Sequence, residues 1–371
     1  MSRTAILCFY QVKNANHGAA EVSLGIYNHW PSNNKRLFEL KDWHLYLCKN
    51  YKVQLLFQYI NSYFIKQFAV LFIILKVLRY LKKNDNNFVI IEGASWIGFS
   101  FLTIKIIRFF RNKTKIFYHS HNVEYDIRKK KNSIIISFIS KILEKIVFEI
   151  SDYASVVSSI DAKRIKYLYN IDPIIFENGV DIERLKINKE FKKNFSKKYI
   201  IYSGSYSYKP NKIAIDYLIN KVMPYFKKKN YNIDLVLTGK NFPNLIKKNN
   251  IICKENLNKN ILNYYIKKSY FVILPLQQAP GTKIKVIENL ILGKTIIGTK
   301  FAFTGIKIMK NSKNCLIYKS FYDLCKKINF FIKNEKTIIQ NAVTSKKFYI
   351  KTYSINNIIK KFIYENKINF I

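Results

Sequence analysis

The stretch that decides the fold is PLQQAPGTKIKVIENLILG, Pro275 to Gly293. The apolar segment before it, Tyr270–Leu274, has the length and composition of a buried strand. A loop with proline and glycine leads from this strand into a helical pattern, in which Lys285 and Glu288 are three residues apart and share a face. Such a helix start offers backbone N–H groups and a positive dipole end to an anion. The lysine and the carboxylate would suit a phosphate and a sugar hydroxyl, as in a nucleotide-sugar site.

Strand and helix patterns alternate along the chain, which predicts α/β layers around parallel sheets. The expected strands cover residues 4–9, 88–92, 115–118, 153–157, 174–176, 199–203, 233–238, 270–274 and 295–298. Residues 182–198 are charged and lack a firm period, so we expect the chain to cross between two domains there. The expected domains cover 1–181 and 182–345, and a helical segment over 346–371 is expected to pack back on the first.

Local signals predict where some helices begin and end. Asn211 precedes apolar residues at helical spacing and is an expected N-cap. Gly293 lies where a glycine commonly ends a helix. The Asn178–Gly179 pair predicts a tight turn with positive φ at the domain crossing, and Asp181 belongs to the same turn. We expect this turn to be structural and to set a hinge.

Composition limits the classes of protein. A length of 371 residues suits two domains, and 49% hydrophobic residues exclude a disordered chain. Lysine and arginine number 64 against 23 aspartate and glutamate residues, which gives a net charge of +41. That charge favours polyanionic partners, namely nucleic acid, anionic lipid or phosphorylated substrates. Compositional drift in a sequence rich in Lys, Asn and Ile is the alternative, and both stay open.

Targeting signals and cysteines indicate the compartment. The five cysteines form no CxxC pair, which favours a reducing environment. The N-terminus does not have the pattern of a signal peptide. The longest strictly apolar run, Phe68–Leu75, is far shorter than the roughly 20 residues that a membrane-spanning helix needs. We therefore expect a cytoplasmic protein, with peripheral contact to the inner membrane face left open.

One apolar helix has two interpretations. The residues Ser133 to Ile150 form a helical pattern that contains Lys141 and Lys145 and follows the basic run Arg128–Lys131. This helix either lies on an anionic membrane surface or packs in the core beside a solvated charge run. The sequence favours neither.

Taken together, these landmarks resemble the GT-B glycosyltransferases, specifically the family 4, group 1 type. The resemblance covers most of the chain. The motifs that carry it are FENGVD (Phe176–Asp181), YSGSYSYKPN (Tyr202–Asn211) with VMP (Val222–Pro224), LVLTGK (Leu235–Lys240) and PLQQAPGTKIKVIENLILGK (Pro275–Lys294). It implies two Rossmann-like domains that face each other across a cleft, an N-terminal acceptor domain and a C-terminal nucleotide-sugar domain.

The resemblance implies a donor site around the helix start. Glu288 would bind the donor ribose hydroxyls and Lys285 the diphosphate, while an exposed ion pair between these two residues is the alternative. Gly281 and Thr282 would present backbone N–H groups to the phosphates. Pro280 stands where many relatives have a glutamate, which leaves in doubt any carboxylate that holds the transferred sugar.

The loop after the strand 199–203 adds to the implied donor site. Lys209 would reach the donor phosphates, with Lys283 in reserve. Ser205 is assigned to the donor site at a position where relatives often have an arginine. A solvated loop lysine is the alternative for Lys209.

The resemblance also implies site residues in the first domain. Gly18, after the first strand, would let the backbone approach the donor phosphate, and His17 replaces a glycine of the family there. His121 would contact the sugar or the reacting centre, as a catalytic residue with Lys285 and Glu288. His119 and Glu124 are weaker candidates for the acceptor or sugar, and Glu124 is also a candidate to orient the histidine.

The function expected from this resemblance is a retaining glycosyltransferase that uses a nucleoside diphosphate sugar. The sequence has no Asp-x-Asp pair, so we expect no metal and no cofactor. The expected acceptor is a cell-surface glycan or a lipid-linked intermediate, and no protein partner is implied. A GT-B epimerase or phosphorylase remains an alternative. A basic nucleic-acid-binding protein is disfavoured, because the chain has no pattern of an RRM, KH or zinc-finger module.

Overall fold

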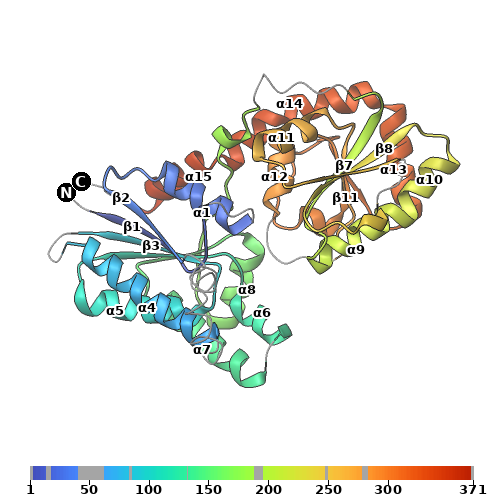
Figure 1. Ribbon diagram of the computed structural model, residues 1–371. Coiled ribbons are helices and arrows are strands. Elements are labelled where there is room, and N and C mark those ends of the chain that lie inside the picture. Colours follow the sequence, from blue (N-terminus) through green and yellow to red (C-terminus); the bar gives the residue numbers. More distant parts are fainter. Residues whose placement is uncertain are drawn as a thin grey trace. The chain divides into compact units, whose positions relative to one another are not determined.

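The chain forms two compact units, shown in a computed structural model (Figure 1). The structure describes residues 3–13, 18–40, 62–82, 86–131, 133–187, 195–246, 250–277 and 283–368. Unit 1 consists of Met1–Gly179 and Ile355–Ile371, and unit 2 of Val180–Ser354. The chain therefore passes from one unit to the other after residues 179 and 354, whereas we expected the domain boundaries after residues 181 and 345. Helix α14 (Glu335–Tyr353) runs past residue 345 within unit 2, so the segment that returns to unit 1 begins at Ile355.

Unit 1 contains a sheet of six parallel strands. Their order across the sheet is β2 (Lys35–Glu39), β1 (Thr4–Cys8), β3 (Phe88–Gly93), β4 (Lys115–Ser120), β5 (Tyr153–Val156) and β6 (Ile174–Ile175). Strands β1 and β3 are buried along their whole length, which is typical of a parallel sheet covered on both faces.

Helices cover both faces of this sheet (Figure 1). Helices α4 (Ser62–Tyr80), α5 (Ile97–Phe110) and α7 (Ile134–Ile150) share one hydrophobic core with the sheet. Helices α1 (Gly18–His29) and α15 (Ile355–Glu365) pack together on the opposite face. The ring of Phe362 in α15 stacks on Phe117 of β4 at 4.4 Å between centroids, so the C-terminal helix is part of the unit 1 core. Shorter helices are α6 (Glu124–Lys131) and α8 (Ser159–Tyr169).

Unit 2 contains a second sheet of six parallel strands. Their order is β12 (Cys315–Tyr318), β11 (Ile296–Thr299), β10 (Val272–Leu274), β7 (Lys198–Ser203), β8 (Ile233–Gly239) and β9 (Ile251–Glu255). Its helices, besides α14, are α9 (Lys209–Tyr217), α10 (Met223–Lys228), α11 (Lys259–Lys268), α12 (Ile284–Ile291) and α13 (Phe321–Lys333). Short helical turns are Ile182–Leu185, Leu218–Val222, Asn244–Ile246 and Lys300–Phe303. The expected α/β class is confirmed.

Two predictions about helix ends have opposite outcomes. Gly293 follows the end of α12 with φ of 74°, so the predicted C-terminal glycine is confirmed. The prediction that Asn211 caps α9 is wrong, because the N-cap is Tyr208. The side chain of Asn211 instead accepts a hydrogen bond from the Tyr202 hydroxyl (2.8 Å) and donates one to the Ser205 carbonyl (3.1 Å). It thereby ties the loop after β7 to the helix.

The turn at Gly179 also differs from its prediction. Neither Asn178 nor Gly179 has a positive φ. A Cβ atom on Gly179 would lie 2.7 Å from the Cα of Ile355, so glycine is required there for space and not for backbone conformation. Asp181 accepts a hydrogen bond from the Glu183 N–H (3.1 Å) and caps the helical turn that follows.

The strand orders place one topological switch point in each sheet. In unit 1 the connections leave in opposite directions from β1 and β3, which are neighbours. In unit 2 the corresponding neighbours are β7 and β10. Open α/β sheets bind ligands beyond the carboxyl ends of the strands at such points. Each unit therefore has one place where its topology favours a binding site.

Candidate active site

The first turn of α12 lies at the switch point of unit 2. Helix α12 follows β10, and β10 pairs with β7, so the helix begins beside the carboxyl end of β7. The Lys285 ammonium donates a hydrogen bond to the Ser203 carbonyl (3.1 Å) and lies 5.0 Å from the centroid of the Tyr202 ring. Burial, with a smaller contribution from the charge of Lys283, lowers the pKa of Lys285 to about 8. This ammonium is poorly hydrated but still charged at neutral pH, which suits it to bind an anion.

Glu288 is held by a different partner from Lys285. Its side chain is buried, and Oε1 accepts a hydrogen bond from the Lys259 ammonium of α11 at 2.5 Å. The alternative of an exposed ion pair between Lys285 and Glu288 does not describe this arrangement, because Glu288 is only 9% exposed and pairs with Lys259. An ionised carboxylate has about four lone-pair sites, so Glu288 retains acceptor capacity beyond the one lysine.

The loop between β7 and α9 carries two further predicted donor residues. The Ser205 hydroxyl lies 3.4 Å from the carbonyl of Lys240, which follows β8. Lys209 is the exposed first residue of α9. Both residues therefore belong to the carboxyl edge of the sheet that also bears Lys285.

Two glycines let the loops after β7 and β8 approach each other. A Cβ atom on Gly239 would lie 2.2 Å from the carbonyl oxygen of Gly204, which no side chain can tolerate. The backbones of the two loops therefore pack directly against each other at this edge of the sheet, with no side chain between them. A close approach of this kind leaves the region beyond the strand ends open to a ligand.

Several predicted residues lie outside the part of the chain that the structure describes. They are His17, Pro280, Gly281 and Thr282. Gly18 is described, and it is the exposed first residue of α1 at the carboxyl end of β1. The donor roles of Gly18, Gly281 and Thr282 stay predictions.

A buried polar cluster occupies the switch point of unit 1. The sheet register aligns Glu92 of β3 with His119 of β4. The Glu92 carboxylate contacts His119 Nδ1 (3.2 Å) and His121 Nε2 (2.8 Å), and it accepts a hydrogen bond from the Ser23 hydroxyl of α1 (2.6 Å). One helix, two strands and the loop after β4 thus contribute to one network around a single carboxylate.

The charge of Glu92 determines the state of this cluster. Burial by itself raises the pKa of Glu92, but the charge and hydrogen bonds of the two histidines outweigh it and hold that pKa well below the usual range. A wholly buried carboxylate is stable only with a positive partner, and protonated imidazole is the partner that the cluster offers. The two imidazoles differ in their surroundings, because Nε2 of His119 is buried with no hydrogen-bond partner, whereas Nε2 of His121 contacts the carboxylate directly.

The same three side chains are the one group, among the described residues, with the geometry to hold a metal ion. The ligand atoms of Glu92, His119 and His121 lie within 4.8 Å of one another. Two histidines and a carboxylate form a ligand set that zinc uses. Their nitrogen and oxygen atoms already pair with each other in the hydrogen bonds above. The expectation that no metal is needed stays a prediction.

Glu92 is the site residue that the sequence analysis missed. We considered Glu124 as the group that orients the histidine, yet Glu124 accepts a hydrogen bond from Arg128 (2.6 Å). The carboxylate that contacts the His121 imidazole is that of Glu92. The available signal was the acidic residue near the end of the otherwise apolar strand FVIIEG, because an unpaired charge is rarely buried.

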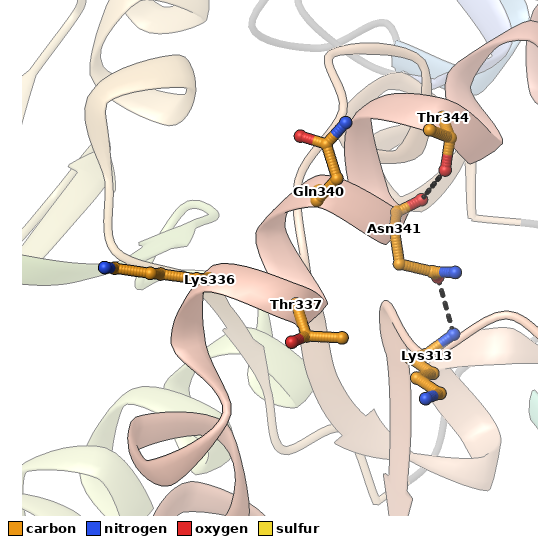
Figure 2. A pocket seen from close by; sticks show the side chains of 6 residues that line it. All are labelled: Lys313, Lys336, Thr337, Gln340, Asn341 and Thr344. Atoms are coloured by element: carbon orange, nitrogen blue, oxygen red, sulfur yellow. Dashed lines mark hydrogen bonds between the residues drawn. The ribbon is translucent and has the colours of Figure 1, made fainter.

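A surface hollow elsewhere in unit 2 is not a candidate site. Figure 2 shows its lining, in which the Asn341 side chain accepts a hydrogen bond from the Lys313 N–H (2.7 Å) and Lys336 points away from the other labelled residues. The hollow lies along α14, and none of the predicted site residues lines it. Its lining consists of Lys313, Lys336, Thr337, Gln340, Asn341 and Thr344.

Comparisons with known proteins agree with this architecture. The structure of Anabaena HepE in complex with UDP-glucose has a TM-score of 0.66 and 12% identity, covering 98% of this chain and 99% of that chain. Sucrose-phosphate synthase from Thermosynechococcus elongatus has a TM-score of 0.71 and 9% identity, covering 98% of each chain. A putative UDP-N-acetylglucosamine 2-epimerase from Listeria monocytogenes has a TM-score of 0.62 and 12% identity, covering 100% of this chain and 98% of that chain. A search of curated protein sequences finds no match.

The two parallel-sheet units and these likenesses define the class of the protein as GT-B. Within unit 2, residues 197–334 match the family model described as Glycosyl transferases group 1. Unit 2 therefore carries a group 1 glycosyltransferase domain, and the chain as a whole shares the GT-B fold of these structures. The expected family and enzyme class are thereby confirmed.

Proposed function

We propose that this protein is a metal-independent, retaining glycosyltransferase that moves a sugar from a nucleoside diphosphate sugar to an acceptor alcohol. The observation that carries the proposal is the pair of charged side chains, Lys285 and the buried Glu288, at the switch point of unit 2. The Lys285 ammonium donates a hydrogen bond to the Ser203 carbonyl, and the Glu288 carboxylate accepts one from the Lys259 ammonium. A cation for a diphosphate and a carboxylate for sugar hydroxyls thus begin the same helix.

Lys285 has the leading role in bond cleavage. As the glycosidic bond breaks, negative charge collects on the departing diphosphate, and a partly desolvated ammonium stabilises that charge more than a hydrated one does. The N-terminal end of α12 adds its dipole. Exposed Lys209 supplies a second cation from the start of α9.

Glu288 orients the nucleoside end of the donor. Its carboxylate accepts hydrogen bonds from the two ribose hydroxyls, and Lys259 fixes the carboxylate before the donor arrives. Lys259 is therefore a positioning residue in this proposal.

The cluster of unit 1 acts on the transferred sugar. His121 contacts the sugar or the reacting centre, and Glu92 holds its imidazole through the hydrogen bond to Nε2. With no carboxylate assigned as a covalent nucleophile, we propose that the acceptor attacks the face from which the diphosphate leaves. Attack on this face retains the anomeric configuration, and the departing donor phosphate takes the acceptor proton.

The donor and acceptor classes have separate support. HepE, which shares the fold, has been solved with UDP and with UDP-glucose, and this supports a nucleoside diphosphate sugar as donor. The net charge of +41 favours an anionic acceptor, and we propose a cell-surface glycan or a lipid-linked, phosphate-bearing intermediate at the inner membrane face.

A panel of nucleoside diphosphate sugars tests this function in the presence of EDTA. We expect one donor to raise Tm, because a ligand at 100 times its Kd stabilises the folded state by about 2.7 kcal/mol. We also expect acceptor-dependent release of the nucleoside diphosphate and an NMR product spectrum with the donor's anomeric configuration. Inversion, or activity that EDTA abolishes and zinc restores, would contradict the mechanism. Conversion of the donor sugar without any acceptor would instead favour the epimerase alternative.

A further inference from the structure

The first three turns of helix α7 are inverted relative to an ordinary surface helix. Their buried residues are Ser137, Ser140 and Glu144, whereas most of their large apolar residues are exposed, and only the last turns of the helix bury the apolar Val147 and Phe148. A surface helix normally buries its apolar stripe and exposes its polar side. The exposed stripe, called here the α7 apolar face, comprises Ile134 (88% exposed), Ile135 (71%), Phe138 (61%), Ile139 and Ile142.

The inversion is fixed by the contacts of Glu144. Its carboxylate accepts hydrogen bonds from the backbone N–H groups of Glu124 (2.7 Å) and Tyr125 (3.2 Å) in α6. It also accepts one from the Tyr169 hydroxyl of α8 (2.6 Å). The polar side of α7 therefore connects three helices of unit 1. Turning the apolar face inward would break all three bonds, so its exposure belongs to the fold.

Basic side chains border the α7 apolar face. Lys129 and Lys130 are exposed at the end of α6, directly before α7. Lys141 and Lys145 lie on α7 itself, and the first turn of the helix has no acidic residue. Lys129 and Lys141 both lie within 6 Å of the Tyr125 ring, so they hold positive charge beside the apolar stripe.

This pattern specifies the partner. An anionic bilayer matches both features of this face, because its acyl chains can cover the isoleucines and its phosphate headgroups can pair with the border lysines. No helix of the described residues is long and apolar enough to span a membrane. We propose that the α7 apolar face inserts into the surface of an anionic lipid bilayer.

The position of this face links it to the candidate active site. Helix α6 begins at Glu124, three residues after His121, and α7 follows directly. The membrane contact would therefore lie at the end of the sheet that bears the histidine cluster. Delivery of a lipid-linked acceptor to that cluster rests on the proposed function, while the membrane contact itself does not.

Vesicle sedimentation with the full chain tests the contact. Wild-type protein is expected to bind vesicles of phosphatidylglycerol and phosphatidylcholine at least about tenfold more tightly than vesicles of phosphatidylcholine alone. The double variant Ile135→Ser, Phe138→Ser removes two exposed apolar side chains and is expected to weaken that binding about tenfold or more. The matched control is Tyr322→Ser in unit 2, whose side chain is 70% exposed, and it is expected to bind as wild type does.

Two results would overturn the membrane proposal. One is equal binding of the double variant and wild type to anionic vesicles. The other is a wild-type dimer in light scattering that the double variant converts to a monomer, with no vesicle binding by either, which would make the face a contact between two copies. Donor turnover on a water-soluble acceptor separates this question from the proposed function, because the double variant should retain it whether or not vesicles bind.

Discussion

Replacing Lys285 by methionine is expected to lower kcat/KM for sugar transfer by about 10²–10³-fold, the usual effect of removing one preorganised stabiliser of transition-state charge. Methionine keeps the length and the buried methylene groups of the side chain and removes the ammonium that lies on the Ser203 carbonyl. Steady-state kinetics at varied donor concentration measure the loss. The matched control is Lys336→Met on the outer side of α14, which should leave kcat/KM within about twofold of wild type.

The pH dependence gives the same test an independent readout. The pKa of Lys285 is lowered to about 8, so the free enzyme loses this charge as the pH rises through 8. Wild-type kcat/KM should therefore decline above about pH 8. Lys285→Arg should retain its charge and shift the decline to higher pH, because a guanidinium does not deprotonate in this range. Activity of Lys285→Met close to that of wild type, with an unchanged alkaline limb, would remove Lys285 from the site.

Replacing Glu92 by glutamine is expected to lower kcat about 10²-fold, within the range of a general acid–base or positioning contribution. Glutamine has the same shape but no negative charge, so it removes the charge that faces the His121 imidazole across the 2.8 Å contact. The donor Kd should change little, because the proposed diphosphate site lies in unit 2. The measurements are kcat and its pH profile, and titration calorimetry for the donor.

Glu124→Gln is the variant to compare with Glu92→Gln. Glu124 lies three residues from His121 in the sequence, but its carboxylate binds Arg128. We expect a much smaller change in kcat for Glu124→Gln and no change in the shape of the pH profile. A loss that is equal in both variants, or larger in Glu124→Gln, would show that Glu92 does not position the histidine.

The central strands were predictable from the sequence, and three edge strands were not. Strands β1, β3, β7, β8 and β10 each contain an unbroken apolar run, as burial on both faces of a parallel sheet favours. The strands that were missed lie at sheet edges, where one side meets solvent: β2 (KRLFE), β9 (IICKE) and β12 (CLIY). Charged residues and short lengths make such strands hard to recognise in a sequence, because only half of the residues in each strand must be apolar.

The candidate site was predictable only where its residues are neighbours in the sequence. Lys285 and Glu288 follow from the local pattern of a helix start. Their partners Ser203 and Lys259 are 82 and 29 residues away, respectively, and come into contact only when the strand order is known. Glu92 likewise acquires its role from His119, 27 residues further on, through the pairing of β3 with β4.

A crystal structure of the protein with its nucleoside diphosphate bound is the most direct measurement of the central claim. The account predicts a phosphate oxygen at hydrogen-bond distance, about 2.7–3.2 Å, from the Lys285 ammonium, and the ribose hydroxyls on the Glu288 carboxylate. A nucleotide bound away from the first turn of α12 would contradict the account. In that result Lys285 would keep its hydrogen bond to the Ser203 carbonyl, and Glu288 would contact only Lys259.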